Sequence, residues 1–152
     1  MAKPRTDQIA ALPLRWEGNK LRVLMVTSRE TRRWVVPKGW QMNGKKPWRA
    51  AEIEALEEAG ALGAVHRRPI GVYHYKKRMP RGKSQRCSVT LYPMQVRRLK
   101  RRWKEAGQRK RHWFSLRKAA KLVDEKSLAL LLRDMAEKAE SNPKILNKLR
   151  VK

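Results

Sequence analysis

The sequence contains a single cysteine, Cys87, among 152 residues. One cysteine cannot form an internal disulfide, and such sparse use of cysteine is compatible with a reducing cytoplasm. No apolar run approaches the roughly 20 residues that a membrane-spanning helix needs. The opening residues, Met-Ala-Lys-Pro-Arg-Thr, lack the apolar core of a signal peptide. We therefore expect a cytoplasmic protein with no membrane partner.

Acidic residues are scarce and unevenly distributed. The chain has 13 acidic and 39 basic residues, which gives a net charge of +26 and a pI near 11.4. No acid occurs in residues 31–51 or 59–104. A field of this strength attracts polyanions, whether nucleic acid, polyphosphate or acidic membrane, and composition does not distinguish among them.

Four of the 13 acids lie within seven positions: Glu52, Glu54, Glu57 and Glu58. Glu54, Glu57 and Glu58 are spaced i, i+3, i+4, which places them on one helix face. Carboxylates this close repel one another unless a cation lies between them, and Mg²⁺ prefers such hard oxygen ligands. The alternative is a solvated acidic face whose charges are balanced by ordinary ion pairs with neighbouring bases.

The acidic cluster follows a loop that contains Gly39 and the turn Asn43-Gly44. We predict a helix from Pro47 or Trp48 to Ala59, because proline suits the first helical turn. Gly60 then suits a left-handed helix stop.

From Gly39 to Ala61 the chain resembles the signature of the Nudix hydrolases. That signature is Gly, five residues, Glu, seven residues, Arg-Glu, an aliphatic residue, any residue, Glu-Glu, any residue, Gly and an aliphatic residue. The spacing is kept without a gap, and the matching motif residues are Gly39, Glu54, Glu57, Glu58 and Gly60. Two positions depart, because Lys45 replaces the first Glu and Ile53 replaces the Arg. Arg49, one turn before Ile53, is a candidate to replace that Arg in part.

Two further runs, Pro37-Lys38-Gly39-Trp40 and the segment 107–115, resemble a bacterial subgroup related to diphosphoinositol polyphosphate and diadenosine polyphosphate hydrolases. The resemblance covers residues 8–135. It implies an α/β/α sandwich with a mixed sheet and a metal-dependent hydrolase that cleaves a diphosphate bond in a nucleoside- or inositol-linked polyphosphate.

The resemblance also implies roles for individual residues. Glu54 and Glu58 would bind Mg²⁺ or Mn²⁺, and Glu57 is the candidate base that deprotonates water. Phosphorylated substrate would be held by basic residues, for which the candidates are Lys38, Lys76, Lys77, Arg78, Arg81 and Arg109. Each of the last five is as compatible with a solvated charge as with a ligand.

The length suits one domain, which we place at residues 8–140 between basic tails at 1–7 and 141–152. Pro13 favours an edge position or a bulge for the first strand. Strands followed by terminal helices favour an α/β sandwich. The predicted strands are 8–16, 20–28, 33–36, one or two within 64–75, 87–96 and 111–114; basic loops occupy 76–86 and 97–110; helices occupy 115–123 and 127–140.

Two other functions remain open at this stage. Ile53 and the net charge of +26 are compatible with a Nudix fold whose catalysis is weakened and which binds RNA or polyphosphate. Hydrolysis at an RNA 5′ end would combine both activities. The three histidines have no metal-ligand spacing, and Trp103 and Trp113 favour packing over stacking on a ligand. The sequence leaves the substrate, the number of metal ions and the oligomeric state open.

Overall fold

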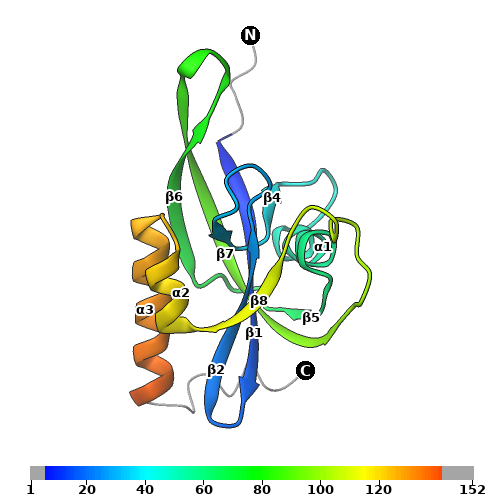
Figure 1. Ribbon diagram of the computed structural model, residues 1–152, viewed down its shortest axis with the longest axis vertical. Helices are drawn as coiled ribbons and strands as arrows, with labels where there is room; N and C mark the ends of the chain where they lie inside the picture. Colours follow the sequence, from blue (N-terminus) through cyan, green and yellow to red (C-terminus); the bar gives the residue numbers. More distant parts are fainter. Residues whose placement is uncertain (1–5, 142–152) are drawn as a thin grey trace.

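The computed structural model describes residues 6–141 as a mixed eight-stranded sheet between two helical layers. Helix α1 covers one face of the sheet, and α2 and α3 pack side by side on the other (Figure 1). The helices are α1 (Pro47–Ala59), α2 (Leu116–Leu122) and α3 (Lys126–Ser141). The strands are β1 (Asp7–Glu17), β2 (Lys20–Thr27), β3 (Trp34–Val35), β4 (Lys38–Trp40), β5 (Ala61–Val65), β6 (Gly71–Arg78), β7 (Ser84–Leu99) and β8 (Arg111–Ser115).

The sheet has one parallel pair at its centre, β1 beside β7, and its other pairs are antiparallel. The main strand order is β3-β2-β1-β7-β5, while β4 pairs with β1, β8 with β2 and β6 with β7. This arrangement confirms the predicted α/β/α sandwich. None of the helices within residues 6–141 has the length and apolar character needed to cross a bilayer.

Two apolar clusters hold the three layers together. Residues of β1 alternate between them, because successive strand side chains point to opposite faces. Ala10, Leu12 and Leu14 face α2 and α3, whereas Ile9 and Ala11 face α1. The amphipathic α3 contributes buried residues to the first cluster, as its sequence pattern predicts; these are Leu128, Ala129, Leu132, Met135 and Ala136.

The predicted edge position of the first strand is wrong, because β1 pairs with neighbours on both sides. Pro13 is tolerated inside the sheet because the hydrogen-bond ladder on one side of β1 has a gap at that residue. The amide of Ala11 donates to the carbonyl of Pro37 at 3.0 Å, and pairing with β2 begins only at Leu14. The nitrogen of Pro13 points to the same side as that of Ala11, between these two contacts, where no ladder donor is required.

The predicted basic loop at 76–86 is also wrong for most of its length. β6 continues to Arg78 and pairs with the start of β7, so that Lys76 lies opposite Arg86 and Arg78 opposite Ser84. Only a 3₁₀ turn at Pro80–Gly82 connects the two strands. The loop was predicted from the run of basic residues with Pro80 and Gly82, and like charges that face each other across strands do disfavour pairing. The antiparallel pairing of β6 and β7 begins nearer the core and continues outward despite this repulsion.

Within 64–75, the structure contains the end of β5 and the start of β6, separated at residues 66–70. Cys87 is a free cysteine and is fully buried. The predicted tails fall almost entirely in residues 1–5 and 142–152, which lie outside the described residues.

Candidate active site

Helix α1 brings its glutamates close to the sheet because small side chains line its inner face. Ala50, Ala51, Ala55 and Ala59 are all fully buried, which lets the helix approach β1 and β4 closely. The helix begins at Pro47 and ends at Gly60, whose φ of 64° is left-handed and whose amide donates to the carbonyl of Leu56 at 3.0 Å. Both predicted helix signals are therefore confirmed.

Glu54 lies directly against the backbone of β4. A Cβ atom added at Gly39 would collide with the Glu54 carboxylate, so that only glycine fits there without movement. The motif glycine and the motif glutamate thus form one contact between strand β4 and helix α1. Residues that are 15 positions apart in the sequence are joined at a single point.

Glu58 is the most enclosed acid of the helix, with only 7% of its surface exposed. Its Oε1 accepts a hydrogen bond from the Lys38 backbone amide at 3.3 Å, and its Oε2 lies 3.5 Å from Nη2 of Arg109. Burial raises the pKa of Glu58, and the guanidinium of Arg109 opposes that rise.

Glu54 and Glu58 lie close enough to influence each other's protonation. Burial first, and then the charges of Glu58 and Glu57, raise the pKa of Glu54 to about 8. No ion pair joins Glu54 to any base within residues 6–141. Two adjacent carboxylates, of which only Glu58 contacts a cation among residues 6–141, need a proton or a further cation, and hard carboxylate oxygens suit Mg²⁺ or Mn²⁺. The donor set therefore fits a divalent metal at Glu54 and Glu58.

Glu57 stands apart from this pair. Its Oε2 accepts a hydrogen bond from Nζ of Lys104 at 3.2 Å, and its side chain is 29% exposed. No group of three or more His, Cys, Asp or Glu side chains arranged to hold a metal occurs in the described chain.

The segment between β7 and β8 closes over the C-terminal end of α1. Nε1 of Trp103 donates to the carbonyl of Glu58 at 2.9 Å, and the amide of Glu105 donates to the carbonyl of Glu57 at 3.1 Å. Nη1 of Arg111 donates to the carbonyl of Ala59 at 2.8 Å. These bonds satisfy helix carbonyls that lack intrahelical partners, and they give Trp103 a packing role.

Arg109, from the same segment, is tied down on three sides. Its side chain is 9% exposed, and Nε donates to Oε1 of Glu105 at 2.7 Å while Nη1 donates to the carbonyl of Thr27 at 3.0 Å. Arg109 therefore contacts Glu58 as a fixed partner. Glu105 was missed by the sequence interpretation. Its signal was its position as the one acid of residues 97–110, four residues before Arg109.

Arg49 does not take the place of the motif arginine. It forms an ion pair with Glu52, one turn along the exposed side of α1, and so does not hold Glu54. The buried guanidinium beside the carboxylates is that of Arg109, which arrives from a different element. The expectation for Arg49 is therefore corrected by the structure.

Lys38 presents its amide and its side chain to different surroundings. The amide serves Glu58, whereas the side chain follows Ala10, its partner across the ladder, towards the face of α2 and α3. There Nζ lies 4.9 Å from the centre of the Tyr75 ring. Burial lowers the pKa of Lys38, and the charges of Glu58 and Glu125 oppose that change.

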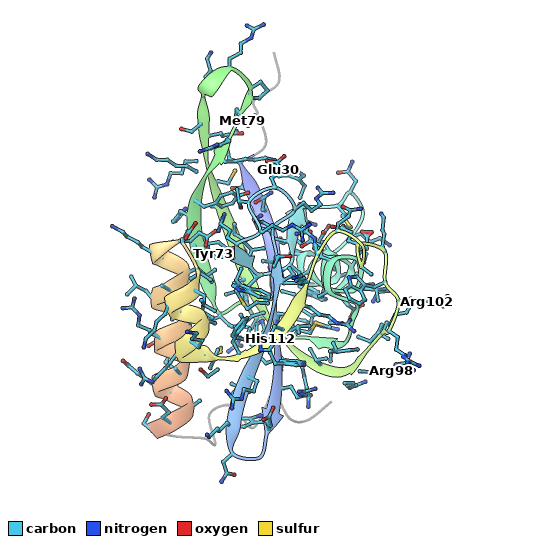
Figure 2. All side chains as sticks on the ribbon, viewed as in Figure 1. Glu30, Tyr73, Met79, Arg98, Arg102 and His112 are labelled. Atoms are coloured by element: carbon cyan, nitrogen blue, oxygen red, sulfur yellow. The ribbon has the colours of Figure 1, made fainter. Side chains whose placement is uncertain are left out.

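Four of the predicted phosphate ligands, Lys76, Lys77, Arg78 and Arg81, are spread along the β6–β7 hairpin and are not gathered at the carboxylates. Lys77 lies over the Trp40 ring at 4.6 Å, while Lys76 and Arg78 are exposed on the opposite face. Arg81 occupies the turn at the end of the hairpin, with φ of 67°. Figure 2 places the neighbouring Met79 at that far end, well away from α1.

Comparison with known proteins identifies the family. No family model matches the chain. It is 29% identical over 132 residues to Nudix hydrolase 13, mitochondrial, of Arabidopsis thaliana, which covers 81% of this chain and 65% of that protein. It is 31% identical over 116 residues to diphosphoinositol polyphosphate phosphohydrolase 3-alpha of Homo sapiens, which covers 75% of this chain and 66% of that protein.

Among solved structures, a C. elegans Ap4A hydrolase superposes with a TM-score of 0.61 at 21% identity, covering 88% of this chain and 98% of that one. At this identity the match shows the fold. The chain therefore has the α/β/α fold of that hydrolase, and its acidic helix α1 packs against Gly39. The chain belongs to the Nudix hydrolase family, whose members generally require divalent metal ions. It spans about half to two thirds of the length of the curated relatives that it matches.

Proposed function

We propose that the protein is a metal-dependent hydrolase that cleaves a diphosphate bond in a nucleoside- or inositol-linked polyphosphate. The observation that carries this proposal is the pair of enclosed carboxylates, Glu54 and Glu58, set against the backbone of Lys38 and Gly39. Curated relatives named as a diphosphoinositol polyphosphate phosphohydrolase and as Nudix hydrolases support the reaction class.

Mg²⁺ or Mn²⁺ would be held by Glu54 and Glu58. Such an ion neutralises phosphate charge and lowers the pKa of a bound water. The chain contributes the arrangement around it: the Lys38 amide and Arg109 hold the Glu58 carboxylate from two sides, and the bare Gly39 backbone leaves room for Glu54.

Glu57 is the proposed base. Its partner Lys104 is 71% exposed, and an ion pair this open contributes little, so that the carboxylate is available to accept a proton at Oε2. Lys38 takes part in this proposal through its backbone amide, which donates to Glu58, because its side chain lies beside Tyr75 on the face of α2 and α3. Arg109 is already held by three partners and acts in this proposal through Glu58.

Phosphate release tests the proposal directly. The purified protein is incubated with Mg²⁺ or Mn²⁺ and with diadenosine polyphosphates, inositol pyrophosphates, nucleoside triphosphates or 5′-triphosphate RNA. Glu54→Gln and Glu58→Gln should each reduce turnover by more than the ~10–100-fold typical of an outer metal contact. Glu57→Gln should abolish base catalysis, and Glu52→Gln is the matched control on the same helix, because Glu52 forms an ion pair with Arg49 and with no other base among residues 6–141.

Loss in the three variants but not in the control would identify both the chemistry and the substrate class. If no compound is cleaved by the wild type, the proposal fails, and the fold with weakened chemistry suggested by Ile53 and Lys45 becomes the better account. Ile53→Arg then decides between them, since a gain of turnover would show that the departure had reduced an existing activity.

A further inference from the structure

The outer half of the β6–β7 hairpin, residues 76–86, extends beyond the rest of the sheet (Figure 1). Six of its eleven residues are basic, and none is acidic. Figure 2 shows side chains projecting from this arm, with Met79 near its end. The proposed hydrolase chemistry does not account for it, because the carboxylates lie beside Gly39, in the row of Ile9, Thr90 and Val72 at the inner end of β6. The six cations are Lys76, Lys77, Arg78, Arg81, Lys83 and Arg86.

Three of these cations share one face of the hairpin. Lys76 lies opposite Arg86, and Arg78 lies one step further out, opposite Ser84. The same alternation leads inward to Thr90, which is the neighbour of Ile9 across β7 and β1. Because Ile9 packs in the cluster under α1, the three cations lie on the α1 side of the sheet. We call Lys76, Arg78 and Arg86 the hairpin patch.

The charges of the hairpin patch are not balanced by the protein. All three side chains are exposed, and no acid within residues 6–141 forms an ion pair with any of them. The nearby acid on this side, Asp7, instead accepts a hydrogen bond from Ser88 Oγ at 2.8 Å. Like charges placed opposite each other across strands are destabilising, and a bound anion would relieve the repulsion between Lys76 and Arg86.

The hairpin patch continues the face that carries the carboxylates. Gly39, which touches Glu54, pairs with Ile9, and Ile9 pairs with Thr90. Lys76 and Arg78 lie four and six residues along β6 from Val72, the partner of Thr90. At about 3.3 Å per residue the cations stand roughly 13 and 20 Å from that row. A polymer with repeated phosphates spans such a length, whereas one compact polyphosphate bound at the carboxylates does not.

On the opposite face of the hairpin, Lys77 already lies over the Trp40 ring at 4.6 Å. The hairpin patch is exposed along the α1 side, which suits a single phosphate backbone laid along that surface. Arginine, lysine and serine are also the side chains that most often contact nucleic-acid phosphates.

We propose that the hairpin patch binds the phosphate backbone of a single-stranded nucleic acid. The cations contact phosphates without reading bases, and the hydroxyl of Ser84 provides a further donor beside Arg78. This function is separate from hydrolysis, because it uses no metal and none of the glutamates of α1.

Salt-dependent binding tests the proposal. A fluorescent 20-nucleotide RNA with a 5′ hydroxyl is titrated with protein in EDTA, so that no hydrolysis can occur, at several salt concentrations. The variant Lys76→Gln, Arg78→Gln, Arg86→Gln should reduce the slope of log affinity against log salt by about 2, since each lost single-strand phosphate contact removes about 0.7. Ser84→Glu, which removes no cation, should weaken binding in the same direction.

The matched control is Lys118→Gln, Lys121→Gln, Arg133→Gln on α2 and α3. It lowers the net charge of +26 by three, as the hairpin variant does. Its slope should stay close to that of the wild type. Equal losses in both triple variants would show attraction by the whole field and would overturn the proposal. So would an unchanged slope in the hairpin variant, binding to duplex but not to single strands, or binding to inorganic polyphosphate alone. A DNA strand of equal length should bind comparably, as a backbone contact requires.

Discussion

Glu54 carries the largest pH consequence of the site. In the metal-free protein its pKa is raised to about 8 from a usual value of 4.5, first by burial and then by the charges of Glu58 and Glu57. A raised carboxyl pKa stabilises the folded state fully only below pH 4.5, and this contribution is lost as the pH rises through about 8. Because Glu54 is partly exposed, solvent screening keeps the loss to about 1–2 kcal/mol.

We therefore predict that, in EDTA, the free energy of unfolding falls between pH 5 and pH 8 and that Glu54→Gln flattens this dependence. Urea unfolding at each pH measures both. Mg²⁺ added at pH 8 should restore stability, because a cation that binds only the folded carboxylate pair stabilises that state. An unchanged pH dependence in Glu54→Gln, with Glu52→Gln as the control, would contradict the assignment.

A second prediction concerns the contribution of Arg109 to the stability of the folded protein. Its guanidinium joins Glu58, Glu105 and the carbonyl of Thr27 while only 9% exposed. Arg109→Ala should destabilise the protein by about 3 kcal/mol or more, because removing one partner of a buried ion pair leaves the other charges uncompensated. The exposed Lys104, which pairs with Glu57, is the control, and Lys104→Ala should cost less than about 1 kcal/mol.

Denaturant unfolding of both variants in EDTA makes this comparison without any contribution from metal. Similar small losses would show that Arg109 behaves as an ordinary surface base. Its contact with Glu58 would then be no more than an open ion pair.

At the scale of the elements, the contact between helix α1 and strand β4 depends on one missing side chain. Gly39→Ala would place a methyl group where the Glu54 carboxylate lies, and the flexible end of that side chain would have to turn away from β4. We expect a loss of about 1 kcal/mol, the low end of what overpacking costs. Gly107→Ala is the control, because nothing lies within 4 Å of a Cβ there and its φ is not left-handed. Thermal unfolding of both variants measures the difference, and equal melting temperatures would refute the contact.

Elements that depend on local sequence signals were predicted, whereas those that depend on distant partners were not. Helix α1 was predicted to its last residue, because the proline at its start and the glycine after its end are local signals. The interior position of β1 and the extension of β6 were not predicted, since both depend on partners distant in the sequence: Pro37 beside Ala11, and Arg86 beside Lys76. For the same reason the motif revealed Glu54 and Glu58 but not their cationic partner. Arg109 lies 51 positions beyond Glu58 and meets it only through the fold.

For the molecule as a whole, the 13 acidic residues neutralise only a third of the 39 basic residues, which leaves the net charge of +26. Several of the ion pairs, such as Arg15–Glu17 and Arg117–Glu140, are largely exposed and contribute little. Most of the basic residues therefore repel one another across the surface, and such self-repulsion opposes the compact state. The hairpin patch is one place where a polyanion would reduce that repulsion.

The balance between surface repulsion and ion pairs predicts how the melting temperature depends on salt. Raising NaCl from about 20 to 300 mM should raise the melting temperature of the metal-free protein, because the Debye length then falls well below 10 Å and screens long-range repulsion more than it weakens the few ion pairs. Thermal melts in EDTA across this range measure the trend, and a neutral osmolyte at matched osmolarity controls for exclusion of solute. The control substitutions Lys118→Gln, Lys121→Gln and Arg133→Gln should raise the melting temperature at low salt and make it less sensitive to salt. A melting temperature that falls with salt would mean that specific ion pairs, led by the buried Arg109 cluster, outweigh the repulsion of the surface.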